Sequence, residues 1–217
     1  VGGGATGIEV AGILSEMKKF VLPNDYPDMS SSLMHIYLIE AGPRLLAGMS
    51  EESSAHAEQF LREMGVNILL NKRVVDYRDH KVVLEDGTEI ATRTFIWVSG
   101  VTGVTIGNLD ASLIGRGGRI KVDSFNRVEG MNNVFAIGDQ CIQLADENYP
   151  NGHPQLAQVA IQQGELLAKN LIRMEKGQEM KPFHYRNLGS MATVGRNRAV
   201  AEFSKVKMQG WFAWVMW

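Results

Sequence analysis

Three glycines at positions 2, 4 and 7 open the chain, and their spacing is that of a loop that binds phosphate. Gly2 allows a sharp turn out of a strand, and Gly4 allows the backbone to approach a pyrophosphate without a Cβ in the way. Gly7 allows the next helix to lie close on a sheet, so that the first N–H groups of that helix, from Ala5 and Thr6 onward, point at the phosphates. Because glycine clusters also occur in ordinary turns, the interpretation depends on the segments that follow.

Those segments have the order of a dinucleotide-binding fold. Apolar residues recur at positions 8, 11, 14 and 17 and predict a helix over 5–20 that ends before Pro23. A β-like run at 35–39 leads to Glu40, where such a fold places the acid that accepts hydrogen bonds from the adenosine ribose. A carboxylate there repels a 2′-phosphate, so NADH is expected rather than NADPH, a preference that the nearby Arg44 weakens slightly.

A second motif lies far downstream. The apolar run 134–137 is expected to be a short strand that delivers Gly138 and Asp139. The glycine would let a flavin ribityl chain pass close, and the aspartate would accept hydrogen bonds from its hydroxyl groups. Pro154 then begins a helix expected over 155–175, which Lys176 and Gly177 end. Found after a phosphate loop, the Gly-Asp pair points to a flavoprotein.

Four segments, 2–9, 39–41, 96–101 and 134–139, resemble the flavoproteins that carry two dinucleotide-binding domains. Within that group, the segments 154–164 and 188–196 and the tryptophan-rich end resemble the type II NADH:quinone oxidoreductases. The resemblance covers nearly the whole chain, and the Ala-Gln-x-Ala-x-Gln-Gln-Gly run at 157–164 is its most specific part. It implies a single polypeptide that takes hydride from NADH onto FAD and passes two electrons to a membrane quinone, without pumping protons.

The resemblance also implies a role for individual residues, by motif position. NADH would be bound by Gly2, Gly4, Gly7 and Glu40, and FAD by Gly138 and Asp139. Further cofactor-binding residues would be Ala5, Thr6, Arg44, Ser99, Gly100, Leu156, Ala157 and Gln163. Glu9 would lie beside the nicotinamide, where its carboxylate would relay protons or favour the helix dipole. Gln158 would lie where flavin and quinone meet; from the residues alone, Gln158 and Gln163 would be polar residues on an exposed helix face.

The expected elements together predict an α/β fold. Ser50 should cap a helix over 51–64, ahead of a strand at 66–70, a meander turning at Asp86-Gly87 and a buried strand at 94–98. We expect a Rossmann-like NAD-binding domain at 1–104, part of a FAD-binding domain at 105–180, and a small β-rich membrane-interface unit at 181–217. In the family, the FAD phosphate loop would precede Val1 and more of the membrane-binding segment would follow Trp217.

Composition excludes several classes of protein. The 217 residues are 45% apolar and 21% charged, and no run approaches the ~18–20 apolar residues of a membrane-spanning helix. One cysteine, Cys141, excludes an internal disulfide and a C-x-x-C pair, and its neighbours predict a buried structural thiol. The five histidines lack metal-ligand spacing, so no metal is expected, and the net charge of −2 gives no sign of a nucleic-acid partner.

Charge is distributed unevenly along the chain. Residues 1–180 hold 16 basic and 23 acidic side chains, whereas 181–217 hold six basic side chains against Glu202 alone. The basic end also carries Trp211, Trp214 and Trp217, and this combination predicts contact with an acidic membrane surface; the alternative is a solvated basic face beside a strand. We therefore expect a peripheral protein on the cytoplasmic side of the plasma membrane, or on the mitochondrial inner membrane in a eukaryote. A membrane quinone would be its partner, and a homodimer is allowed.

Two other classes of function compete with this interpretation. One is another flavoprotein, such as a disulfide reductase, a sulfide:quinone reductase or a ferredoxin reductase. The sulfur-handling enzymes need paired cysteines, and a soluble ferredoxin reductase would not need the tryptophan-rich end. The other is a non-catalytic module that senses NAD, against which the Gly138-Asp139 motif argues.

Overall fold

The structure is a computed structural model that describes residues 1–104, 106–203 and 206–216, and it contains two compact units. Unit 1 comprises residues 1–100 and 189–217, and unit 2 comprises residues 101–188. The contacts thus group residues from 189 onward with the first hundred residues, whereas the sequence suggested a separate unit from 181. The division into a NAD-binding, a FAD-binding and a membrane-interface domain stays a prediction.

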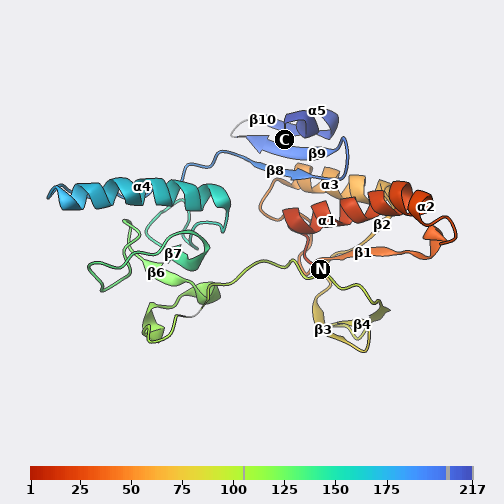
Figure 1. Ribbon diagram of the computed structural model, residues 1–217, viewed down its shortest axis with the longest axis horizontal. Helices are drawn as coiled ribbons and strands as arrows, with labels where there is room; N and C mark the ends of the chain where they lie inside the picture. The colour runs from red at the N-terminus through yellow and green to blue at the C-terminus, as the bar shows by residue number, and fades with distance from the viewer. Residues whose placement is uncertain (105, 204–205, 217) are drawn as a thin grey trace. The chain divides into compact units, whose positions relative to one another are not determined.

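Unit 1 has the α/β architecture predicted from the sequence. The helices α1 (Ala5–Glu16) and α3 (Glu51–Glu63) accompany the parallel strands β1 (Ile36–Ile39) and β2 (Val66–Leu69), which pair with Ile36 opposite Val66. The two helices form a layer between this strand pair and a second sheet built from the C-terminal segment (Figure 1). One apolar core joins these layers, because Ile8 and Leu61 of the helices and Val194 near the second sheet belong to the same buried cluster.

The second sheet is antiparallel and consists of β8 (Ser190–Thr193), β9 (Ala199–Phe203) and β10 (Val206–Gln209). A short helix that the sequence did not predict, α5 (Gly210–Met216), packs on β9. Ser50 caps α3 as expected, and Glu202 of β9 accepts hydrogen bonds from the backbone N–H of Ser50 at 2.9 Å and from its hydroxyl. Burial raises the pKa of Glu202, but the hydrogen bonds from Ser50 and Ser53 outweigh this effect and keep it below its usual value.

The first helix does not end before Pro23, so that expectation is wrong. A π-helical turn (Met17–Val21) follows α1 and leads into α2 (Leu22–Asp25), with Pro23 in its first turn. The N–H of Leu22 bonds to the carbonyl of Met17, five residues earlier. Proline lacks an N–H, and its ring clashes with the carbonyl four residues before it, so a wider turn lets the helix continue.

The antiparallel meander is present as predicted, with β3 (Val74–Arg78), β4 (Lys81–Leu84) and β5 (Glu89–Ala91). Gly87 turns the hairpin with a φ of +82°.

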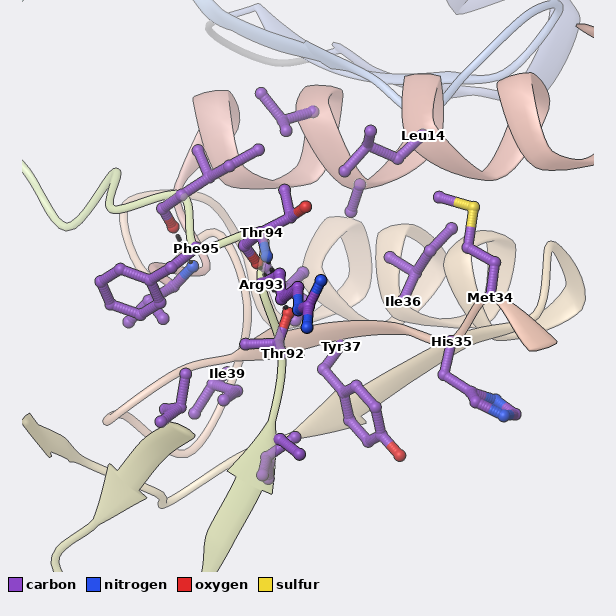
Figure 2. Close-up of a pocket in the computed structure, with 18 of the residues that line it drawn as sticks. Leu14, Met34, His35, Ile36, Tyr37, Ile39, Thr92, Arg93, Thr94 and Phe95 are labelled. Atoms are coloured by element: carbon purple, nitrogen blue, oxygen red, sulfur yellow. Dashed lines mark hydrogen bonds between the residues drawn. The ribbon is translucent and has the colours of Figure 1, made fainter. Parts of the chain in front are cut away.

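The buried strand expected at 94–98 is an extended, largely exposed segment, so that expectation is also wrong. Trp97, for example, is 56% exposed. The segment pairs with Val1, which donates to Ile96 O at 2.7 Å and accepts from Val98 N at 2.9 Å, while the N–H of Gly2 bonds to Ile39 O of β1. A cavity of about 610 Å³ lies between α1, β1 and residues 92–95, as the close-up shows (Figure 2).

Unit 2 contains a parallel pair, β6 (Ile120–Val122) and β7 (Cys141–Gln143), and the long helix α4 (Ala157–Glu175). The strand expected at 134–137 is absent from the described structure of this region, where Phe135 makes an isolated bridge to Arg127 and a 3₁₀ turn (Gly138–Gln140) follows. Cys141 is buried as predicted, and burial raises the pKa of its thiol. No helix among the described residues is long and apolar enough to cross a membrane.

Candidate functional site

The glycine loop in unit 1 is built so that two of its glycines are sterically required. Gly2 has a φ of +111°, and a Cβ there would stand 2.7 Å from the carbonyl oxygen of Val98. A Cβ on Gly7 would stand only 1.8 Å from the carbonyl oxygen of Gly2, so α1 can approach the loop only with glycine at this position. At Gly4, by contrast, no described atom lies within 4 Å of the place a Cβ would take. The loop is therefore tightly packed at Gly2 and Gly7 and has an open face at Gly4.

The N-terminus of α1 opens onto that same face. Gly4 is the N-cap, and among the described residues no side chain caps the helix and none in its first turn is acidic. The exposed first residues, Ala5 and Thr6, carry N–H groups at the positive end of the helix dipole, which is suited to a phosphate. Glu9 lies half-buried in the second turn, beyond the short range over which the dipole acts, so a role in favouring the dipole loses support.

Glu40 is joined directly to the glycine loop. Its Oε2 accepts a hydrogen bond from the N–H of Gly3 at 2.5 Å, and its Oε1 accepts one from the N–H of Gly42 at 2.7 Å. Each carboxylate oxygen has a further lone pair, so the pair of backbone bonds fixes the group and leaves it able to accept more hydrogen bonds. The sequence analysis did not assign a role to Gly3, which is packed against Glu40. The unbroken run of three glycines at 2–4 could have indicated that this position also needs a residue without a side chain.

Arg44, Ser99 and Gly100 lie on segments that border the loop. The guanidinium of Arg44 donates to the carbonyl oxygens of Met49 at 2.7 Å and Ala47 at 2.9 Å, so it holds its own loop folded. The hydroxyl of Ser99 donates to Val1 O at 3.3 Å, and Gly100 follows with a φ of +97°. Arg44 thus has two of its donors engaged, which reduces its capacity to bind a 2′-phosphate.

A second candidate site in unit 2 centres on the Gly-Asp turn. Gly138 has a φ of +67°, and its N–H donates to Oε1 of Gln163 at 2.7 Å. Gln163 is only 1% exposed, so the alternative that it is a polar residue on an exposed helix face is wrong. Its bond to Gly138 fixes the turn, and its place in a cofactor site stays a prediction. Asp139 is exposed, and its backbone carbonyl accepts a bond from Gln155 Nε2 at 3.1 Å. The turn thus presents a fixed backbone and a solvent-facing carboxylate, which fits a hydroxyl-rich chain.

The N-terminus of α4 belongs to the same unit as the turn. Leu156 is the N-cap and Ala157 the first helical residue, both exposed, and no described side chain caps this end. Gln158, in the first turn, accepts a hydrogen bond from the N–H of Leu188 at 3.1 Å through Oε1. Its carboxamide is therefore oriented by the protein and does not simply point to solvent.

The C-terminal segment presents apolar surface on α5. Trp211 is 54% and Phe212 70% exposed, whereas Trp214 packs on the small alanine cluster beneath the helix. Lys207 forms an ion pair with Glu52 at 3.2 Å. Lys205 and Trp217, which also entered the membrane prediction, lie outside the described residues.

Comparison with known proteins agrees with this geometry. Residues 1–164 match the pyridine nucleotide-disulphide oxidoreductase family. The type II NADH:quinone oxidoreductase NdhA of Mycobacterium tuberculosis is 34% identical over the whole chain, and the type II enzyme of Haemophilus influenzae is 31% identical over 98% of it. The mitochondrial internal alternative NAD(P)H-ubiquinone oxidoreductase A1 of Arabidopsis thaliana is 33% identical over the whole chain. The chain spans about half the length of these relatives, between 45% and 49%.

Solved structures show the same fold. NDH2 from Plasmodium falciparum, in a structure with NADH, superimposes on the whole chain with a TM-score of 0.87 at 20% identity, and 59% of that protein is covered. A ferredoxin reductase from Rhodopseudomonas palustris gives a TM-score of 0.61 at 17% identity, over 96% of this chain and 54% of that one. The relatives named as NADH:quinone oxidoreductases, together with the matched family, place the chain: it belongs to the pyridine nucleotide-disulphide oxidoreductases and has type II NADH:quinone oxidoreductases as its homologues.

Proposed function

We propose that the full-length protein oxidises NADH and reduces a membrane quinone to the quinol, with consumption of one proton and without pumping protons. The names of the relatives support this activity over that of a ferredoxin or sulfide:quinone reductase or of an NAD sensor. FAD would be the bound cofactor and would supply the two-electron chemistry between hydride donor and quinone. The residues of this chain would bind the two cofactors and orient the quinone.

The observation that carries the proposal is the hydrogen bond that joins Glu40 to the glycine loop, next to the open face at Gly4. The N–H groups at the start of α1 would bind the pyrophosphate at the open face beside Gly4. Glu40, tied to the same loop through Gly3, would accept hydrogen bonds from the adenosine ribose hydroxyls. A 2′-phosphate would place its charge against that carboxylate, so NADH is the expected donor.

The residues of unit 2 fit the cofactor assigned to them. The Gly138–Asp139 turn, held by Gln163, would bind the ribityl chain through the exposed carboxylate of Asp139. Leu156 and Ala157 at the uncapped start of α4 would contact the flavin ring system. Gln158 would donate a hydrogen bond to a quinone carbonyl. Glu9 would lie beside the nicotinamide and relay a proton.

A peripheral position on the membrane completes the proposal. Trp211 and Phe212 on α5 would enter the apolar layer while basic residues of the C-terminal segment meet anionic headgroups, each adding up to ~1 kcal/mol. The relatives come from bacteria and from mitochondria, so the plasma membrane or the mitochondrial inner membrane is the expected site.

Cofactor preference tests the assignment of Glu40. Steady-state turnover of the full-length enzyme should be much faster with NADH than with NADPH at equal concentration. Glu40→Gln should lower the ratio of kcat/KM with NADH to kcat/KM with NADPH, because an amide does not repel a 2′-phosphate. Glu85→Gln, which removes an equally negative but exposed side chain from the meander, serves as the control and should leave the ratio unchanged. Equal use of the two donors by the unmodified enzyme would refute the assignment.

A further inference from the structure

A segment of unit 2 crosses α4 as an extended strap, residues 181–188. Its side chains alternate: Phe183 and Tyr185 are buried, whereas His184 and Arg186 are exposed. The two buried rings pack in one cluster with Val159 of α4. The strap therefore has one apolar face that docks on the helix, and its backbone runs beside α4 up to Leu188.

Three side-chain amides of α4 bind the backbone of this strap. Asn170 donates to the carbonyl of Lys181 at 2.8 Å and accepts from the N–H of Lys181 at 2.9 Å. Gln162 contacts Arg186 in the same way, donating to its carbonyl at 2.9 Å and accepting from its N–H at 3.0 Å. Nearer the start of α4, Gln158 accepts from the N–H of Leu188.

The register of these bonds fits an extended chain running antiparallel to a helix. Residues 158, 162, 166 and 170 lie four apart, so they share one face of α4. Between Gln162 and Gln158 the helix advances about 6 Å, and between Arg186 and Leu188 an extended chain advances about 6.6 Å. One helical turn thus matches two residues of the strap, so Gln162 and Gln158 contact alternate residues of the strap.

We propose that Gln162 is a positioning residue for Gln158. By holding both backbone polar groups of Arg186, Gln162 fixes the strap at the place where the N–H of Leu188 can orient the carboxamide of Gln158. Gln162 touches no cofactor in this scheme; it acts through the strap. We call the two hydrogen bonds between Gln162 and the backbone of Arg186 the clasp. The clasp is a property of the fold, whereas its consequence for catalysis rests on the proposed function, in which Gln158 meets the quinone.

The test replaces the amide of Gln162 in the full-length protein. Gln162→Leu shortens the side chain by one atom and removes both hydrogen bonds, and Gln162→Glu keeps an acceptor for the N–H of Arg186 but loses the donor. Glu165→Leu, at an exposed position further along α4, is the control for a new apolar side chain on the helix. Amide hydrogen exchange of the strap, quinone KM and the rate of the NADH half-reaction are measured for each.

In Gln162→Leu, exchange at Arg186 and Leu188 should accelerate about tenfold or more, since about two net hydrogen bonds are lost. Quinone KM should rise severalfold while the NADH half-reaction keeps its rate, and Gln162→Glu should fall between the parent and Gln162→Leu. Unchanged exchange in a folded Gln162→Leu protein would refute the clasp. Accelerated exchange with unchanged quinone KM would refute the positioning role. A parent enzyme that reduces no quinone would instead overturn the proposed function, and the exchange result would still decide the clasp.

Discussion

Gly7→Ala should destabilise unit 1 more than any other single-methyl change in the glycine loop. The new Cβ would lie 1.8 Å from the carbonyl oxygen of Gly2, where real Cβ contacts essentially never fall below 3.0 Å. Both atoms belong to rigid parts of the fold, because Gly2 is hydrogen-bonded to Ile39 and Gly7 lies in the first turn of α1. The helix must therefore move away from the loop by about 1.2 Å.

The cost of that movement follows from the packing behind α1. Ile8 is fully buried and Ala11 nearly so, which means that a shift of the helix opens gaps against β1. Overpacking of this kind costs about 3 kcal/mol, which lowers the melting temperature of a unit this size by about 6–12 °C.

Gly4→Ala is the matched control, since the same methyl group meets open space there. The change at an N-cap should cost at most about 1 kcal/mol, yet it should weaken NADH binding about tenfold or more because the methyl group stands where the pyrophosphate would approach. Calorimetric melting of both variants, with NADH binding followed by fluorescence, separates the two effects. A Gly7→Ala protein as stable as the parent would show that α1 does not contact the loop as described, and unchanged NADH affinity in Gly4→Ala would remove the phosphate from this face.

Two further predictions concern stability. Ser50→Ala removes the cap of α3 and the hydroxyl bond to Glu202, and should cost about 1–2 kcal/mol in denaturant unfolding, with Ser53→Ala costing less. In unit 2, the hydrogen bond from His153 Nε2 at 3.0 Å holds the pKa of the buried Asp146 below its usual value of 3.8. A carboxyl group whose pKa is lower in the folded than in the unfolded protein stabilises the fold at pH values above its unfolded-state pKa. This contribution to the free energy of unfolding is lost as the pH falls from the unfolded-state pKa through the folded-state pKa. Unfolding free energy should therefore fall less steeply below about pH 4 in Asp146→Asn than in the parent; parallel pH profiles would contradict this assignment.

The sequence predicted those features that depend on neighbours in the chain. The cap at Ser50, the turn at Gly87 and the extent of α4 were confirmed because each is decided by local backbone chemistry. The strands expected at 94–98 and 134–137 were wrong because a strand is defined by the regular pairing of its backbone with a partner elsewhere in the chain, and residues 134–136 make an isolated bridge instead. A pattern of apolar residues cannot show whether that partner is present.

In the candidate sites, too, the sequence predicted features set by neighbouring residues and missed those that depend on distant contacts. The role of the glycines was visible in their spacing, but the bond from Gly3 to Glu40 depends on a contact across 37 residues. Gln162 and Gln163 are adjacent and identical in type, yet one binds the strap and the other is buried behind Gly138. Only the direction of each side chain around α4 distinguishes them, and the sequence does not show which face of α4 is covered by the strap and which by the Gly138 turn.

The most direct test of the central claim is double-mixing stopped flow on the full-length protein. Mixing with NADH should bleach the visible flavin absorbance, and a second mixing with a short-chain quinone should restore it. Gln158→Ala should leave the first phase nearly unchanged and slow the second. A protein without flavin absorbance, or one whose absorbance NADH does not bleach, would contradict the proposed function. Equal slowing of both phases in Gln158→Ala would contradict the place given to Gln158.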